Sequence, residues 1–232
     1  LIAQGASLTY ETSLATGLEF TLGGRVEDQG SAAREIRSVF TGGDFTPNPA
    51  VAEGAFAGAT ARLEGRTGLA RWALGADLLA PLGTPTLRDS ALTGADPVAK
   101  LYGEWRQRVG AGRMGFSVTA RAGASAGGDL PQAAFRLGGL ATVRGYPYGA
   151  VTGAAFWSAQ VDVPLKRGDV RPVVFADAGQ AGPVRGLAAR PVLAGAGAGL
   201  SFFGGIFRMD LSWPVYPTGG RPRFDLVFGA PR

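Results

Sequence analysis

Two residue types that carry much enzyme chemistry are missing from this sequence of 232 residues. It contains neither His nor Cys, which removes imidazole acid–base catalysis, thiol catalysis and the zinc sites built on these ligands. Residues 123–127 read Gly-Ala-Ser-Ala-Gly and match the G-x-S-x-G pattern of serine hydrolases, but that pattern needs a general base, usually His. We interpret it as a chance match in a Gly/Ala-rich loop. We expect that the protein is not an enzyme and uses no cofactor or metal.

A second glycine pattern has a structural interpretation. Residues 195–199 read Gly-Ala-Gly-Ala-Gly, which imitates half of a dinucleotide-binding fingerprint without the helix that would present phosphate-binding N–H groups. On a strand, the alternate small residues would leave room for another segment of the chain to fold against that face.

The chemistry that remains is that of a buried ion pair. Arg144 lies in the longest segment between predicted strands, residues 125–153, and a loop of this length is expected to fold back onto the protein. An arginine placed in a narrow, poorly hydrated interior needs acidic partners. Asp162 and Asp177 follow on the next two predicted strands. A planar guanidinium can pair with one carboxylate through two N–H groups and bond the other as well.

Strands must position these side chains. The 38 Gly and 15 Pro leave little room for long helices, whereas alternation of apolar and polar residues recurs along the chain. The pattern predicts strands, with ends uncertain by a few residues, at 5–12, 17–27, 55–66, 69–80, 98–109, 113–124, 154–165, 170–179, 192–203, 205–215 and 221–229.

On each predicted strand, one alternating set is almost wholly apolar and the other collects the charges. Phe207, Met209 and Leu211 illustrate the apolar set, whose exceptions are Gly103 and Gln107. Asp162 and Asp177 fall in the charged set. The apolar set also contains four tryptophans, each expected to be lipid-facing bulk or part of an interfacial girdle: Trp72, Trp105, Trp157 and Trp213.

The connections sort by length in alternation, which a soluble β-sandwich has no reason to show. The short ones are at 13–16, 67–68, 110–112, 166–169 and 204, and the mostly long ones are at 28–54, 81–97, 125–153, 180–191 and 216–220. Short turns on one side and long loops on the other are typical of outer-membrane β-barrels, whose strands are apolar outside and polar inside. We predict an all-β, transmembrane antiparallel β-barrel with the loop 125–153 folded into its lumen.

The number of strands has two interpretations. Bacterial single-chain barrels have an even number of strands, whereas the pattern gives eleven. A twelfth strand would lie within 28–54, for instance at 34–40; alternatively, the chain is the C-terminal part of a 16-stranded barrel and lacks strands that precede Leu1. We favour about twelve strands.

Charge and hydropathy exclude other classes. The net charge is +5, but the basic residues are scattered among 18 acidic ones, so we expect no nucleic-acid binding. No run approaches the 18 or more apolar residues of a membrane helix. Residues 1–4 show no export signal, so we expect that any signal is already removed or lies outside this sequence.

The loop and the strands after it resemble a known family. Residues 138–146 of the loop have the pattern Gly-Gly-x-x-x-Val-Arg-Gly-Tyr. This pattern is followed by strands that read Gln-Val-Asp-Val-Pro-Leu at 160–165 and Val-Phe-Ala-Asp-Ala-Gly at 174–179. This resembles the C-terminal barrel of the Omp85 superfamily, or surface antigen D15, which includes BamA- and TamA-type insertases and two-partner-secretion transporters. The similarity covers residues 135–229, including 208–214. Residues 1–134 match the family only in the general pattern of barrel strands. The loop residues that carry it are Gly138, Gly139, Val143, Arg144, Gly145 and Tyr146.

The resemblance implies roles for three residues. Arg144 would be the arginine that enters the barrel, and Asp162 and Asp177 its two acidic partners on the wall. The family normally has 16 strands and N-terminal periplasmic POTRA modules, and neither fits in 232 residues. We therefore expect one barrel domain over 1–232 without POTRA modules. The terminal Phe typical of the family is displaced by residues 229–232.

The resemblance also implies a function. We expect an Omp85-like barrel in the bacterial outer membrane that assists protein insertion or translocation, by loop insertion and a weak strand seam. The alternative, from another class, is a small passive pore or a structural anchor for a partner assembly. The expected partners are outer-membrane lipid and lipopolysaccharide, together with unfolded outer-membrane or secreted proteins, or periplasmic or surface partner proteins.

Overall fold

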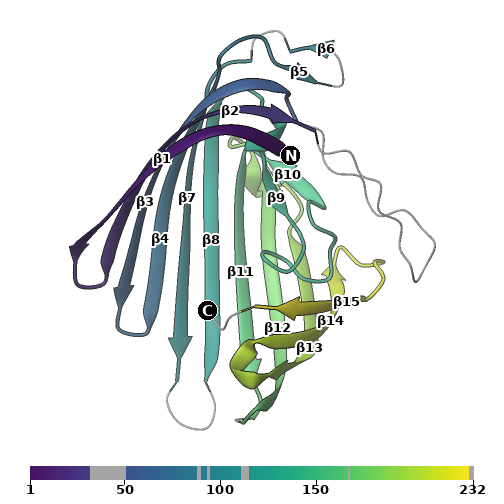
Figure 1. Cartoon of the computed structure of the whole chain (residues 1–232). Helices are drawn as coiled ribbons and strands as arrows, with labels where there is room; N and C mark the ends of the chain where they lie inside the picture. The colour runs from purple at the N-terminus through teal and green to yellow at the C-terminus, as the bar shows by residue number, and fades with distance from the viewer. Residues whose placement is uncertain (32–50, 88–89, 93–94, 111–114, 167, 230–232) are drawn as a thin grey trace.

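Eleven antiparallel strands form the main sheet of the computed structural model, which describes residues 1–31, 51–87, 90–92, 95–110, 115–166 and 168–229. Each strand pairs with the next along the order β1-β2-β3-β4-β7-β8-β11-β12-β13-β14-β15 (Figure 1). Their bounds are β1 Ile2–Ala15, β2 Leu18–Gly30, β3 Gly54–Thr67, β4 Ala70–Pro81, β7 Val98–Val109, β8 Phe116–Gly127, β11 Ala155–Pro164, β12 Val170–Gly182, β13 Leu193–Phe202, β14 Phe207–Tyr216 and β15 Arg223–Phe228.

The connections carry the smaller elements. Two short hairpins, β5 (Thr86–Leu87) with β6 (Ser90–Ala91) and β9 (Phe135–Leu137) with β10 (Val151–Gly153), lie outside the main sheet. The described helices are 3₁₀ turns of three residues each, too short to span a membrane: η1 (Pro131–Ala133), η2 (Leu187–Ala189) and η3 (Phe203–Gly205).

The all-β, antiparallel prediction is confirmed. Every predicted strand is present in the sheet, with ends displaced by a few residues; β12, for example, continues to Gly182. The candidate twelfth strand at 34–40 lies outside the described residues. The apolar set faces outward: Leu8, Leu101 and Phe224 are 81%, 66% and 61% exposed.

The position of the G-x-S-x-G segment is a correction. We expected it in a loop, but β8 continues to Gly127, paired with Val98 of β7. The segment stays in the strand because its small residues fit beneath the loop that follows. A Cβ on Gly123 would lie 2.7 Å from the ring of Phe135, and Ser125 donates its N–H to the Ala154 carbonyl. The long loop therefore begins after Gly127.

The sheet is curved, and the β9–β10 hairpin with its loop lies on the concave side (Figure 1). We call this side the inner face. Two apolar clusters attach the loop to it. Leu130 and Ala133 pack with Phe56 of β3 and its neighbours in β4 and β7, while Leu137 and Val143 pack with the end of β12 and the start of β13. The loop therefore joins both halves of the sheet.

Candidate functional site

The loop between β9 and β10 is folded tightly by its glycines. Gly138 and Gly139 have φ values of 111° and 82°, in the left-handed region that favours glycine. The Thr142 hydroxyl donates to the Gly138 carbonyl at 3.0 Å and accepts from its N–H at 2.8 Å. The Gly139 N–H donates to the Tyr146 carbonyl at 2.9 Å, which closes the loop. These bonds bury Val143 completely and direct Arg144 toward the sheet.

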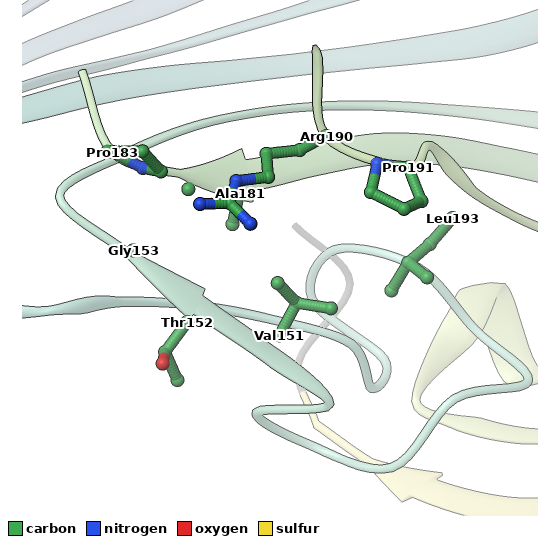
Figure 2. A pocket seen from close by; sticks show the side chains of 9 residues that line it. Val151, Thr152, Gly153, Ala181, Pro183, Arg190, Pro191 and Leu193 are labelled. Carbon is green, nitrogen blue, oxygen red and sulfur yellow. The ribbon is translucent and has the colours of Figure 1, made fainter. Parts of the chain in front are cut away.

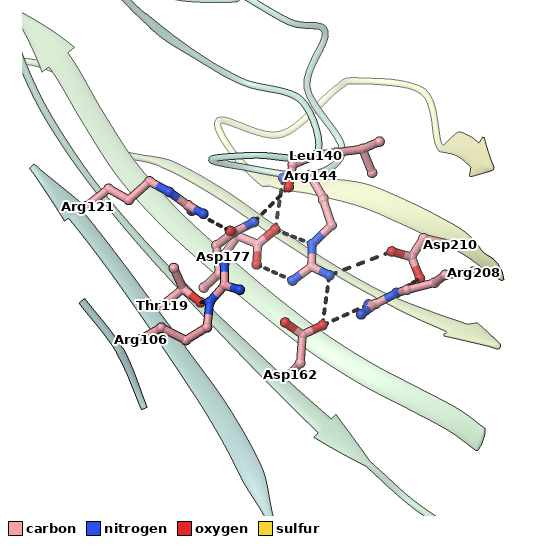
Figure 3. Close-up of polar contacts among 10 residues, drawn as sticks. Arg106, Thr119, Arg121, Leu140, Arg144, Asp162, Asp177, Arg208 and Asp210 are labelled. Carbon is pink, nitrogen blue, oxygen red and sulfur yellow. Dashed lines mark hydrogen bonds and ion pairs between the residues drawn. The ribbon is translucent and has the colours of Figure 1, made fainter. Parts of the chain in front are cut away.

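Arg144 contacts both acidic residues that the alternation pattern placed on the inner face (Figure 3). Its Nε and Nη2 donate to the two carboxylate oxygens of Asp177 at 2.7 and 2.6 Å, and its backbone N–H donates to the same carboxylate at 2.9 Å. Its Nη1 donates to Asp162 at 2.9 Å. The bidentate pair is therefore with β12, and the single bond is with β11.

This pairing offsets the cost of burial. The side chains of Arg144 and Asp177 are 4% and 0% exposed, so either charge alone would be strongly destabilising. Burial by itself lowers the pKa of the Arg144 guanidinium. The hydrogen bonds and charges of Asp177 and Asp162 outweigh burial and raise that pKa above its ordinary value. Burial in this site therefore does not neutralise Arg144.

Phe175 forms the floor of the site. It lies two residues before Asp177 on the same face of β12, and the Arg144 guanidinium carbon is 3.7 Å from the centre of its ring. A cation over an aromatic face is attracted by about 1–2 kcal/mol when desolvated. We did not single out Phe175 from the sequence. The signal was its place in the charged alternating set, where a large aromatic residue is out of pattern.

A second arginine extends the network to β14. Arg208 donates to Asp162 at 2.7 Å through Nη2 and to Asp210 at 2.7 Å through Nε, and Asp210 lies 3.7 Å from Arg144. Asp162 is thus shared by two guanidinium groups. Alternation placed both β14 residues on the inner face, but it could not show that β14 faces the loop. That depends on the curvature of the sheet.

The tip of the loop is held from the other side by β8 and β11. Arg121 donates to the Ala141 carbonyl at 2.6 Å and Gln160 donates to the Leu140 carbonyl at 3.1 Å, and these two side chains are themselves joined at 2.8 Å. Arg121 also pairs with Glu104 of β7 at 2.6 Å. Sequence reasoning missed this part, because a backbone carbonyl in a loop leaves no residue signature.

The Gly-Ala-Gly-Ala-Gly segment makes room for the loop, as its pattern predicted. It lies in β13, and its glycines face inward. A Cβ on Gly195 would lie 2.0 Å from the Arg144 carbonyl, one on Gly197 would lie 2.4 Å from the Phe175 ring, and one on Gly199 would lie 2.0 Å from Asp210. The absence of side chains at these three positions lets the network approach the wall.

Tyr146 closes the loop against β14. Its hydroxyl donates to the Tyr216 carbonyl at 2.6 Å. Gly145, with a φ of 92°, passes so close to β14 that a Cβ there would lie 2.7 Å from the Trp213 backbone. The structure therefore brings together all eight predicted site residues: the six loop residues on one side and Asp162 and Asp177 of the wall on the other. Tyr148 does not join them and is 69% exposed.

A pocket of about 300 Å³ lies beside these residues, between β10, the end of β12 and residues 190–193 (Figure 2). Val151 and Leu193 give it apolar walls, and Arg190 contributes charge. Within the described ranges, no group of three or more acidic side chains is arranged to hold a metal ion.

The two aspartates are expected to contribute unequally. Asp177→Asn removes the charge from a fully buried bidentate partner and should lower the free energy of unfolding by about 3 kcal/mol. Asp162→Asn should cost about 1 kcal/mol, because Asp162 is 24% exposed and Arg208 keeps Asp210 as a partner. Urea unfolding in detergent, followed by tryptophan fluorescence, measures both. Equal losses would contradict the assignment of Asp177 as the main partner.

No family model matches the sequence, and no curated protein is significantly similar to it. Among solved structures, CdiB from Escherichia coli superposes with a TM-score of 0.57 at 15% identity, over 97% of this chain. The fold is therefore similar to that of CdiB. CdiB from Acinetobacter baumannii is also similar, with a TM-score of 0.49 at 15% identity over 96% of this chain. The chain spans less than half of these two proteins, 44% and 48% of their lengths.

Proposed function

We propose that this chain forms an Omp85-like barrel of the bacterial outer membrane that assists translocation or insertion of proteins. The observation that carries the proposal is the loop arginine, Arg144, bound to Asp177 and Asp162 on the inner face of a sheet whose fold is similar to that of CdiB. The structural neighbour CdiB is a two-partner-secretion transporter, which favours translocation of a secreted polypeptide.

In this proposal the loop is a removable plug. It is held by side-chain contacts and two small apolar clusters, with no covalent link to the wall. A substrate chain would displace it and move along the polar inner face. The sheet also offers a weak seam, because β15 pairs with β14 along only six residues, from Phe207↔Phe228 to Ser212↔Arg223. Non-covalent displacement needs none of the groups that enzymes use.

Lipid would be the second partner. The outward residues of the sheet are mostly apolar and many are large, and in an outer membrane they would contact lipid chains and, in the outer leaflet, lipopolysaccharide. Trp105 and Trp213, 40% and 43% exposed, lie in this set. We infer a localisation in the outer membrane of a Gram-negative bacterium, with the long loops outside and the short turns in the periplasm.

Deletion of the gene in its source bacterium tests the function. We expect at least one protein to disappear from the medium or from the outer membrane, because its translocation requires this barrel. The wild-type gene should restore it, and the Arg144→Ala gene should not. Quantitative mass spectrometry of both fractions is the measurement. Unchanged protein content in both fractions would contradict the proposed function.

The alternative of a passive pore or anchor makes a different prediction in a planar bilayer. A loop that plugs the barrel should keep the conductance of the purified protein low, and Arg144→Ala should raise it severalfold because the loop loses its main anchor. A wild-type barrel that is already open, with conductance unchanged by the substitution, would contradict the plug and favour a passive pore.

A further inference from the structure

Several cations of the inner face have an acidic partner on the same strand or on the neighbouring one. Arg25 pairs with Glu27, Arg62 with Glu64 and Arg208 with Asp210. Arg106 and Arg121 share Glu104. Within the described residues, Arg66 of β3 and Arg71 of β4 have no acidic group within ion-pair distance.

These two arginines lie in register with a third. Arg66 is directly opposite Arg71 in the β3–β4 ladder, and Arg71 is directly opposite Arg106 in the β4–β7 ladder. Directly opposite residues of antiparallel strands share a face, with Cβ atoms about 4.5–5.5 Å apart. We call Arg66, Arg71 and Arg106 the arginine row.

The row faces inward. Arg106 donates to Thr119 of β8 at 3.3 Å, and Thr119 is directly opposite Gln160, which bonds the loop tip (Figure 3). The arginines opposite Arg106 therefore lie on the same inner face as the loop. The row is also close to the short turns, since β3 ends at Thr67 and β4 begins at Ala70. In an outer-membrane barrel these turns are on the periplasmic side.

Like charges directly opposite one another are unfavourable without counter-charges, and among the described residues Arg106 alone of the three has an ion pair, with Glu104. Arg66 and Arg71 are exposed, so each keeps N–H donors free of contacts within the sheet. Guanidinium groups bind carboxylates through two parallel N–H bonds, a geometry that lysine cannot supply. The row spans about 10 Å around the wall, three strands at about 4.8 Å spacing, and alternate side chains of an extended peptide repeat at about 6.8 Å. Two carboxylates of one such peptide can therefore reach the row together.

We propose that the arginine row receives acidic segments of an unfolded polypeptide as they enter the barrel from the side of the short turns. This proposal rests on the proposed translocation function. Membrane lipid is not the proposed occupant, because lipid contacts the outer face of the sheet, while the row lies on the inner face. The partner is recognised by charge and by extended shape, so no particular sequence is required.

A peptide-binding measurement tests the row on the purified full chain. The probe is a fluorescent 12-residue peptide of Gly, Ser and four Asp, and its matched control has Asn at the same four positions. We expect the Asp peptide to bind, more weakly as salt rises, and the Asn peptide to bind at least tenfold more weakly. The double variant Arg66→Gln/Arg71→Gln should bind the Asp peptide about tenfold more weakly than wild type, the loss of two exposed charge contacts.

The variants are chosen so that folding does not obscure the result. Arg106 is left in place, because it bonds Thr119 and Glu104. Arg185→Gln, in the exposed loop after β12, changes the net charge without touching the row and should leave binding unchanged. If the double variant unfolds at lower urea than wild type, Arg71→Gln alone replaces it, with about a threefold loss expected.

The outcomes separate this proposal from the proposed function. Equal binding of the Asp peptide to wild type and to the double variant would contradict the proposal that the arginine row binds acidic segments, even if gene deletion abolishes secretion. Equal binding of the Asp and Asn peptides would overturn it too. Binding that depends on Arg66 and Arg71, in a chain whose deletion leaves both proteomes unchanged, would support the row as an acidic-peptide site and remove the translocation function.

Discussion

Arg144→Ala is expected to release the loop from the wall and to lower the free energy of unfolding by about 3–5 kcal/mol. The substitution leaves Asp177, which is fully buried, with one remaining hydrogen-bond donor among the described residues, the backbone N–H of residue 144. It also removes the nearer of the two cations above Phe175 and one of the two guanidinium partners of Asp162. Urea unfolding in detergent measures the loss.

Two further variants make this result specific. Arg185→Ala removes an arginine from an exposed loop and should change stability by less than about 0.5 kcal/mol. Arg144→Lys keeps the charge but loses the bidentate geometry, so its cost should lie between those of the alanine variant and wild type. A cost for Arg144→Ala no larger than that of Arg185→Ala would show that the network does not hold the loop.

The second large effect is expected from one added methyl group. Gly195→Ala places a Cβ 2.0 Å from the Arg144 carbonyl, where neither β13 nor the loop can accept it without moving. Overpacking of this kind costs about 1–3 kcal/mol. The loop is held by fewer contacts than the strand, so we expect the loop to move. Its displacement should raise bilayer conductance as well as lower stability.

The matched control is Gly24→Ala, on the outer set of β2. A Cβ on Gly24 meets nothing within 4 Å. The same substitution in a strand should therefore be neutral or slightly stabilising, since Ala restricts the unfolded chain more than Gly does. If the two alanine variants had the same stability and conductance, close contact between β13 and the loop would be contradicted.

The fold and the centre of the site could be predicted from sequence because both depend on local rules. Alternation assigns each side chain to a face independently of how the sheet closes, so Asp162 and Asp177 were placed inward from their own strands. The need of a buried arginine for carboxylates then joined them to Arg144. The small residues of β13 also predicted an inserted segment, because an inward face without side chains leaves space that another part of the chain can fill.

The remainder of the site depends on curvature, which alternation does not encode. Arg208 and Asp210 lie on β14, three strands along from β11, and they meet Asp162 only because the sheet curls around the loop. Arg121 bonds a main-chain carbonyl, which any residue could offer. The G-x-S-x-G segment was misplaced because Gly weakens a strand interior in isolation, whereas Gly123 is required here by the closeness of Phe135.

Labelling of a single cysteine tests the central claim, that the loop is inserted and held by Arg144. The chain has no Cys, so Val143→Cys and Tyr148→Cys each introduce one reactive thiol, the first at a fully buried position and the second at one that is 69% exposed. We expect maleimide to label position 148 rapidly and position 143 slowly in the folded protein, and Arg144→Ala to make position 143 reactive. Equally rapid labelling of both positions in the protein with Arg144 intact would contradict the account.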